Sequence, residues 1–89
     1  MAARPAVFLD VFGTVVEDPG VLETVARFKF KAGAAAAIMR FVDAGYLVFL
    51  STCRDGVPVP PPAYLQRLRA RVRDELTRHG LTAAAVHFI

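Results

Sequence analysis

Two apolar runs in this 89-residue chain end on polar side chains of a kind that takes part in catalysis. The first run, residues 6–9, is followed by Asp10, and the second, residues 46–50, is followed by Ser51 and Thr52. A carboxylate can act as a nucleophile, and a nearby hydroxyl can donate a hydrogen bond to a bound oxyanion. These groups meet the needs of phosphoryl or acyl transfer. The alternative is that Asp10 only caps the turn that follows it.

The segments around these residues predict how the chain brings them together. Both apolar runs are typical of strands in a parallel sheet that is covered on both faces. From residue 32, apolar side chains recur at spacings of three and four, which predicts a helix that ends at Gly45 in a left-handed conformation. A strand, a helix and a second strand form a right-handed crossover with parallel strands. We therefore expect the loops after Asp10 and Leu50 to lie side by side, in the crevice where α/β proteins bind ligands.

A second helix and a third strand are expected in the last third of the sequence. Prolines keep residues 57–62 extended, and an apolar stripe then predicts a helix over residues 63–79 with Gly80 as its stop. Residues 83–89 are interpreted as the third strand. The predicted fold class is α/β, a three-stranded parallel Rossmann-like sheet in the order β-loop-α-β-α-β, with residues 1–89 in a single domain. The apolar stripe consists of Leu65, Leu68, Val72 and Leu76.

The polar face of the second helix is basic. Its arginines could follow the phosphates of a nucleic acid, but Asp74 and Glu75 interrupt them, and Asp74 has the favourable i,i+4 spacing to Arg78. We interpret this face as a solvated surface and expect no nucleic-acid partner. The arginines concerned are Arg67, Arg69, Arg71, Arg73 and Arg78.

Other polar residues have a structural interpretation. Lys29 and Lys31 alternate with aromatic residues; they could meet an anionic substrate, but a solvated edge segment explains them. Residues 15–20 contain a Pro-Gly pair and predict a loop. His79 suits the C-terminal turn of a helix, and His87 suits a structural position in a strand, so neither is assigned to a site.

Composition limits the classes of function. The formal net charge is +3, which favours anionic partners without identifying nucleic acid as one. Cys53 is the only cysteine, so no intramolecular disulfide can form, and no closely spaced Cys and His residues predict a metal cluster. No apolar run reaches the roughly 18 residues that a membrane span needs. We expect a soluble, cytoplasmic protein without a membrane partner.

The segment Phe8-Leu9-Asp10-Val11-Phe12-Gly13-Thr14 resembles the first motif of the haloacid dehalogenase (HAD) superfamily. The resemblance implies that Asp10 is a nucleophile and that a hydroxyl of the second strand end orients the oxyanion. Thr52 is preferred over Ser51 for that role, because Thr52-Cys53-Arg54-Asp55-Gly56 is similar to the second motif of histidinol phosphatases and heptose bisphosphate phosphatases. Substrate contacts are expected from the residues of the two loops, namely Phe12, Gly13, Thr14, Cys53 and Arg54.

The chain departs from the family pattern at Phe12. Phosphatases of the family have a second aspartate at this position, which acts as general acid and base, whereas the dehalogenase branch has an apolar or aromatic residue. Thr52 follows Asp10 by 42 positions, which leaves no room for the helical cap domain that true dehalogenases insert there. We therefore interpret the chain as a capless phosphatase scaffold in which Phe12 replaces the general acid.

The family's third motif, a Lys or Arg, and its fourth, a set of acidic residues, lie beyond the third strand. The 89 residues thus correspond to a truncated domain, the N-terminal half of a HAD-like domain. Asp10 and the backbone carbonyl of Phe12 are the expected ligands of Mg²⁺. Because magnesium would need phosphate and water oxygens for its remaining positions, we expect weak binding.

Two functions remain open. The first is a phosphatase-type hydrolase that acts on a small phosphorylated metabolite and is weak or incomplete as a lone chain. The second is a non-catalytic interaction or regulatory module derived from such a hydrolase. One edge of the first strand is expected to lack a neighbour, which predicts a homodimer or a partner chain that completes the sheet.

Overall fold

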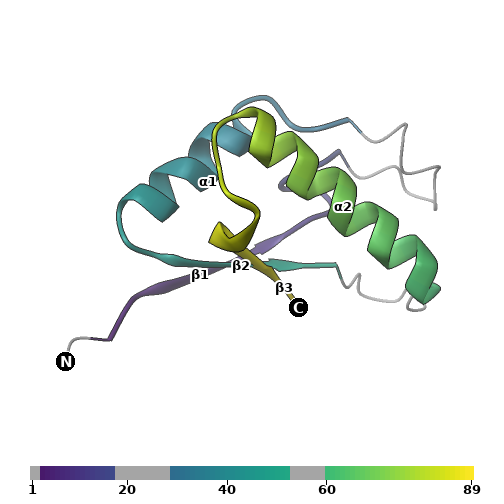
Figure 1. The fold of residues 1–89 in the computed structure, drawn as a ribbon, viewed down its shortest axis with the longest axis horizontal. Helices are drawn as coiled ribbons and strands as arrows, with labels where there is room; N and C mark the ends of the chain where they lie inside the picture. Colours follow the sequence, from purple (N-terminus) through teal and green to yellow (C-terminus); the bar gives the residue numbers. More distant parts are fainter. Residues whose placement is uncertain (1–2, 18–28, 53–59) are drawn as a thin grey trace.

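The computed structural model describes residues 3–17, 29–52 and 60–89. The elements are β1 (Ala6–Asp10), α1 (Ala34–Asp43), β2 (Leu47–Ser51), α2 (Pro62–Arg78), the 3₁₀ helix η2 (Ala83–Ala85) and β3 (Val86–Phe88) (Figure 1). The strands form one parallel sheet in the order β1-β2-β3. This arrangement confirms the predicted α/β class and the order of strands and helices.

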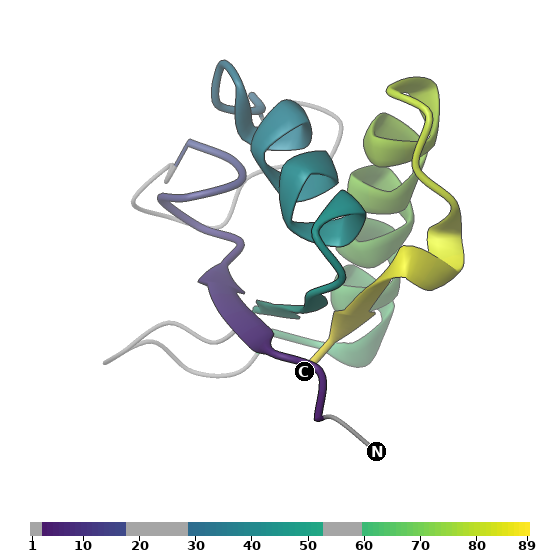
Figure 2. The same ribbon diagram turned by 90° about the vertical axis from the view of Figure 1, so that its left-hand side faces the viewer.

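Both helices lie on the same face of the sheet (Figure 2). Because each crossover steps to the next strand in the same direction, right-handed connections place α1 and α2 on one side. Val48 and Leu50 of β2 are fully buried against this layer. The core therefore lies between the sheet and the two helices, with Ile38 from α1 and Leu68, Val72 and Leu76 from α2.

The opposite face of the sheet carries an aromatic row. Phe8 is in register with Phe49, and Phe49 with His87. The Phe8 and Phe49 rings stack with centroids 5.0 Å apart, and the Phe49 and His87 rings are 5.4 Å apart. Phe8 remains 65% exposed. The expectation that the strands are covered on both faces is therefore wrong for the described residues, since both helices lie on the other side.

Glycines set the limits of α1. Gly33 precedes the helix with φ of 81°, and Gly45 follows it with φ of 90°, in the left-handed region that glycine adopts without a Cβ penalty. The Gly45 N–H donates to the Val42 carbonyl at 3.0 Å. The predicted left-handed stop at Gly45 is confirmed. The alanine-rich first turn places Ile38 against the sheet, where it is 1% exposed.

The first residue of α2 is Pro62, which the sequence analysis placed in the extended connector. Proline is favoured at this position because the first helical N–H needs no partner within the helix. The predicted apolar stripe is buried at Leu68, Val72 and Leu76, and Tyr64, which was not included in it, is buried as well.

Three arginines on the basic face of α2 contact aromatic rings. The guanidinium groups of Arg69 and Arg73 lie 5.8 and 4.8 Å from the ring centroid of Phe88 in β3. Arg71 lies 5.1 Å from the ring centroid of Phe30. Such cation–π contacts also bury the aliphatic stems of arginine. The interpretation of the face as purely solvated is therefore wrong at these three positions.

The third strand is shorter than expected. Residues 83–85 form η2, in which the Ala85 N–H donates to the Thr82 carbonyl at 3.0 Å, and the strand begins only at Val86. Three consecutive alanines favour a helical turn over a strand, because alanine has little β propensity. The predicted strand over residues 83–89 is thus wrong at its first three positions.

The segment predicted as a loop after the first strand contributes to the core. Val15 and Val16 are 1% and 0% exposed, and Val16 forms isolated bridges with Phe12 and Phe30. Half of the proline-rich connector, residues 57–59, lies outside the described residues. Among the helices that are described, none is long and apolar enough to cross a membrane.

Candidate active site

Asp10 is the last residue of β1 and is exposed. Its partner in the parallel register is Ser51, the last residue of β2. The Val11 N–H donates to the Ser51 carbonyl at 2.8 Å, so the two strands stay paired one residue beyond Asp10. The two strand ends that the sequence analysis singled out are therefore side by side.

The loop after Asp10 is tight. The Val11 carbonyl accepts from the N–H groups of Val15 at 3.1 Å and Val16 at 2.9 Å, and the Gly13 N–H donates to the Val16 carbonyl at 2.8 Å. Gly13 has φ of 88°, a conformation that strains any residue with a Cβ. Gly13 and Thr14 are exposed on this loop, next to the end of β1.

Phe12 occupies a different environment from its neighbours. Its side chain is 8% exposed and belongs to the core cluster, although a substrate contact was expected from it. Only its backbone lies on the loop that follows Asp10. The structure thus places an apolar core side chain at the position where the resemblance to phosphatases of the HAD superfamily implies a second aspartate.

The two candidate hydroxyls lie in different surroundings. Ser51 is half-buried and in register with Asp10, whereas Thr52 is 4% exposed. The Thr52 hydroxyl donates to the Ile89 carbonyl at a long 3.5 Å, which joins the end of β2 to the residue after β3. Cys53 and Arg54, the other expected contacts, lie outside the described residues.

The strand ends offer few ligands for a metal. Within residues 3–17, 29–52 and 60–89, no group of three or more His, Cys, Asp or Glu side chains could hold a metal ion. One exposed carboxylate, that of Asp10, fits Mg²⁺ only if water and phosphate oxygens complete its octahedron. The described strand ends therefore supply only a small part of a magnesium coordination sphere.

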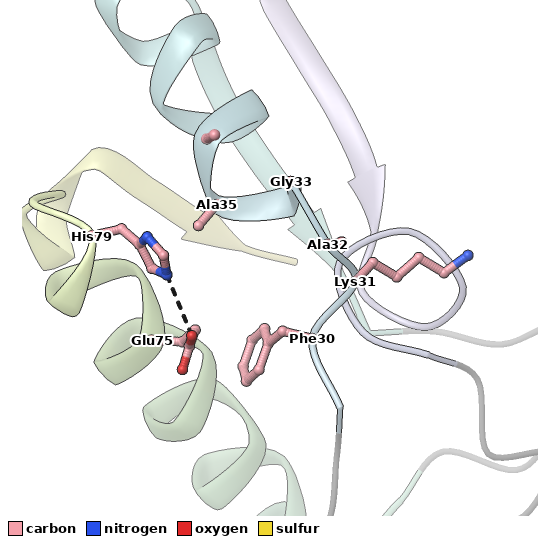
Figure 3. Close-up of a pocket in the computed structure, with 8 residues that line it drawn as sticks. Phe30, Lys31, Ala32, Gly33, Ala35, Glu75 and His79 are labelled. Atoms are coloured by element: carbon pink, nitrogen blue, oxygen red, sulfur yellow. Dashed lines mark ion pairs between the residues drawn. The ribbon is translucent and has the colours of Figure 1, made fainter.

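A pocket of about 380 Å³ lies between the start of α1 and the end of α2 (Figure 3). The Glu75 carboxylate faces it and contacts Arg71 at 3.7 Å, His79 at 3.4 Å and Arg78. The expected pair of Arg78 with Asp74 is thus replaced by a pair with Glu75. Lys31 lines the pocket, but its side chain points away. The lining consists of Phe30, Lys31, Ala32, Gly33, Ala35, Ala36, Glu75 and His79.

The sequence analysis did not assign this pocket. The i,i+4 spacing of Glu75 and His79 predicts that these two side chains lie on one face of α2. It does not predict that the start of α1 lies opposite them. None of the residues predicted for catalysis lines the pocket. The Glu75 carboxylate already pairs with the guanidinium groups of Arg71 and Arg78, so it is a poorer nucleophile candidate than the exposed Asp10 at the strand ends.

Comparison with known proteins bears on the fold. No protein-family model matches the chain, and a search of curated proteins found no relative. Solved structures do match, and they show that the chain has the α/β fold of HAD-like phosphatases. One is the D,D-heptose 1,7-bisphosphate phosphatase of B. bronchiseptica, with a TM-score of 0.75 and 21% identity. The other is a protein of Mesorhizobium loti described as a HAD-like phosphatase, with a TM-score of 0.75 and 25% identity.

Each match covers most of this chain but only part of the solved protein. The first covers 97% of this chain and 50% of the heptose bisphosphate phosphatase, whose structure was solved with magnesium and phosphate. The second covers 89% of this chain and 39% of the other protein. The chain therefore spans half or less of the solved proteins it matches. The resemblance to a truncated HAD-like phosphatase domain is confirmed at the level of the fold.

Proposed function

We propose that this chain is a phosphatase-type hydrolase that acts on a small phosphorylated metabolite through Asp10. The observation that carries the proposal is the exposed carboxylate of Asp10 at the carboxyl end of β1, opposite Ser51, in a fold shared with HAD-like phosphatases. Ligands of open α/β sheets bind at this end of the strands. A cytoplasmic location accords with the single cysteine, Cys53.

The proposed reaction has two steps. The Asp10 carboxylate attacks phosphorus, the bond to the ester oxygen breaks, and an aspartyl phosphate forms; water then attacks phosphorus and releases phosphate and free Asp10. The Ser51 hydroxyl, or the Thr52 hydroxyl after it releases the Ile89 carbonyl, donates to a phosphoryl oxygen, and the exposed loop at Gly13 and Thr14 lies beside it. When bound, Mg²⁺ would neutralise charge on the phosphoryl oxygens.

Phe12 limits the rate of this reaction. A leaving alkoxide needs a proton, and the apolar Phe12 side chain, which lies in the core, cannot supply one. General acid and base catalysis typically contributes about 10² to 10⁴ in rate. We therefore propose that residues 1–89 alone turn over phosphate esters weakly.

The burial of Phe12 also favours a second candidate function, which is non-catalytic. The burial of Phe12 stabilises the fold at a position where a catalytic acid would cost stability. A non-catalytic interaction or regulatory module has no need of that acid. The two functions differ in whether Asp10 reacts.

The test is hydrolysis of p-nitrophenyl phosphate with and without Mg²⁺. We expect slow, magnesium-dependent turnover that Asp10→Asn abolishes. Asp43→Asn is the matched control, because Asp43 is an exposed carboxylate at the far end of α1 and should leave turnover unchanged. Turnover that survives Asp10→Asn would refute the nucleophile assignment, and no turnover at all would favour the interaction module.

A further inference from the structure

Lys31 lies next to the loop that follows Asp10. Its N–H donates to the Val15 carbonyl at 2.9 Å, and the Val15 N–H donates to the Val11 carbonyl at 3.1 Å. Val11 is the residue after Asp10, which ends β1. Two hydrogen bonds therefore connect the backbone of Lys31 to the strand end that carries the candidate nucleophile.

The Lys31 side chain is exposed and is directed toward this loop. Figure 3 shows it pointing away from the pocket and across the loop that follows β1. The preceding residue, Phe30, lines the pocket instead, and the Arg71 guanidinium lies 5.1 Å from its ring centroid. Successive side chains of an extended segment point in opposite directions. The packing of Phe30 against α2 thus directs Lys31 to the opposite side.

The two lysines of this segment have different neighbours across the pairing with the loop. The pairing is antiparallel, so Lys29 lies directly opposite Glu17, and facing residues of opposite charge attract each other. Lys31 lies opposite Val15, which carries no charge. Within residues 3–17, 29–52 and 60–89, the ion pairs all involve Glu75. The charge of Lys31 is therefore the less compensated of the two.

We propose that Lys31 binds the phosphoryl group of the substrate beside Asp10, an inference that rests on the proposed function. A phosphate monoester carries between one and two negative charges at neutral pH, and the Asp10 carboxylate that attacks it is also negative. Like charges repel each other, so a cation at this point lowers the cost of their approach. The ammonium group of lysine binds phosphate as a compact point charge with three donors.

This assignment makes Lys31 a substrate-positioning residue. The Ser51 hydroxyl, which lies in β2 opposite Asp10, donates to the phosphoryl group from the sheet. Lys31 approaches it from the loop. Loss of the ammonium group should therefore weaken the binding of phosphate, whether or not the ester is hydrolysed.

The test is the binding of inorganic phosphate, measured by isothermal titration calorimetry with and without Mg²⁺. Lys31→Gln should raise the Kd for phosphate by roughly tenfold or more, because it removes a charge-assisted hydrogen bond. Lys29→Gln is the matched control, since it removes the same charge from the same segment, and we expect a change of less than about threefold. Lys31→Arg keeps the charge and should restore most of the affinity.

Circular dichroism should show that all three variants are folded, because both lysines are exposed. Equal losses of affinity in Lys31→Gln and Lys29→Gln would mean that only the net charge of the segment matters, and would overturn the assignment of Lys31. Absence of phosphate binding by the wild type would overturn it as well.

Kinetics with p-nitrophenyl phosphate separate this inference from the proposed function. Lys31→Gln should raise KM by about the factor found for the Kd of phosphate. If Asp10→Asn abolishes turnover while Lys31→Gln leaves KM and phosphate binding unchanged, the role of Lys31 is refuted and the proposed function stands. If no protein turns over the ester but Lys31→Gln still weakens phosphate binding, the phosphate site stands and the proposed hydrolysis fails.

Discussion

Asp10 and Phe12, two residues apart, have opposite surroundings. Asp10 is exposed at the strand end, while the Phe12 side chain is 8% exposed within the core. The Val11 carbonyl accepts hydrogen bonds from the N–H groups of Val15 and Val16, and this turn holds the two side chains in their different surroundings. A carboxylate at position 12 would therefore be directed into apolar surroundings, and charge buried without a partner is strongly unfavourable.

Phe12→Asp should therefore lower the melting temperature clearly and raise phosphatase turnover little. Removal of a buried phenyl ring alone typically costs about 3 to 5 kcal/mol. Thermal unfolding followed by circular dichroism measures the change, and Thr14→Asp, at an exposed position in the same loop, is the control and should have little effect. An unchanged melting temperature together with a large gain in phosphatase turnover would show that this position faces the substrate.

Sequence patterns predicted the candidate residues only where a periodic element ends. Asp10 and Ser51 follow apolar runs, so their place at adjacent strand ends followed from the crossover. The inward turn of Phe12 and the burial of Val15 and Val16 were not predictable in this way. These residues lie in an aperiodic loop whose hydrogen bonds to Val11 decide which side chains point inward.

At the scale of elements, α2 contributes most of the buried helical side chains. Leu68 is 0% exposed and lies in its buried stripe with Val72 and Leu76. The helix ends before Gly80, whose φ of 94° suits only glycine well. Packing of this stripe on the sheet is therefore the main contribution of α2 to stability.

Leu68→Ala should lower the free energy of unfolding by about 2 to 5 kcal/mol, because it removes buried methyl groups and leaves a cavity. Chemical denaturation with urea measures the loss. Gln66→Ala, an exposed change in the same helix, should alter the free energy by less than about 0.5 kcal/mol. Equal effects of the two changes would mean that the stripe does not pack as described.

Element boundaries were predictable where glycine or proline marks them. Gly45 and Gly80 mark the ends of α1 and α2 as predicted, whereas α2 begins at Pro62, one residue before its predicted start. The start of β3 was not predictable, because an alanine triplet carries no period of its own. The contacts of Arg69 and Arg73 with Phe88 were also missed, since they depend on how β3 lies beneath α2.

At the scale of the molecule, the described helices cover one face of the sheet and leave the other face open among the described residues. The order β1-β2-β3 puts both helices on one side (Figure 2). The row of Phe8, Phe49 and His87 lies on the other side. The chain matches 50% of a heptose bisphosphate phosphatase.

The most direct test of the central proposal is chemical trapping of Asp10. The protein is mixed with p-nitrophenyl phosphate and Mg²⁺, quenched in acid and treated with sodium borohydride, which reduces an aspartyl phosphate to homoserine. We expect peptide mass spectrometry to find homoserine at position 10 in the wild type and in Asp43→Asn, and none in Asp10→Asn. Absence of homoserine at position 10 in the wild type, under conditions where nitrophenol is released, would contradict the assignment of Asp10 as nucleophile.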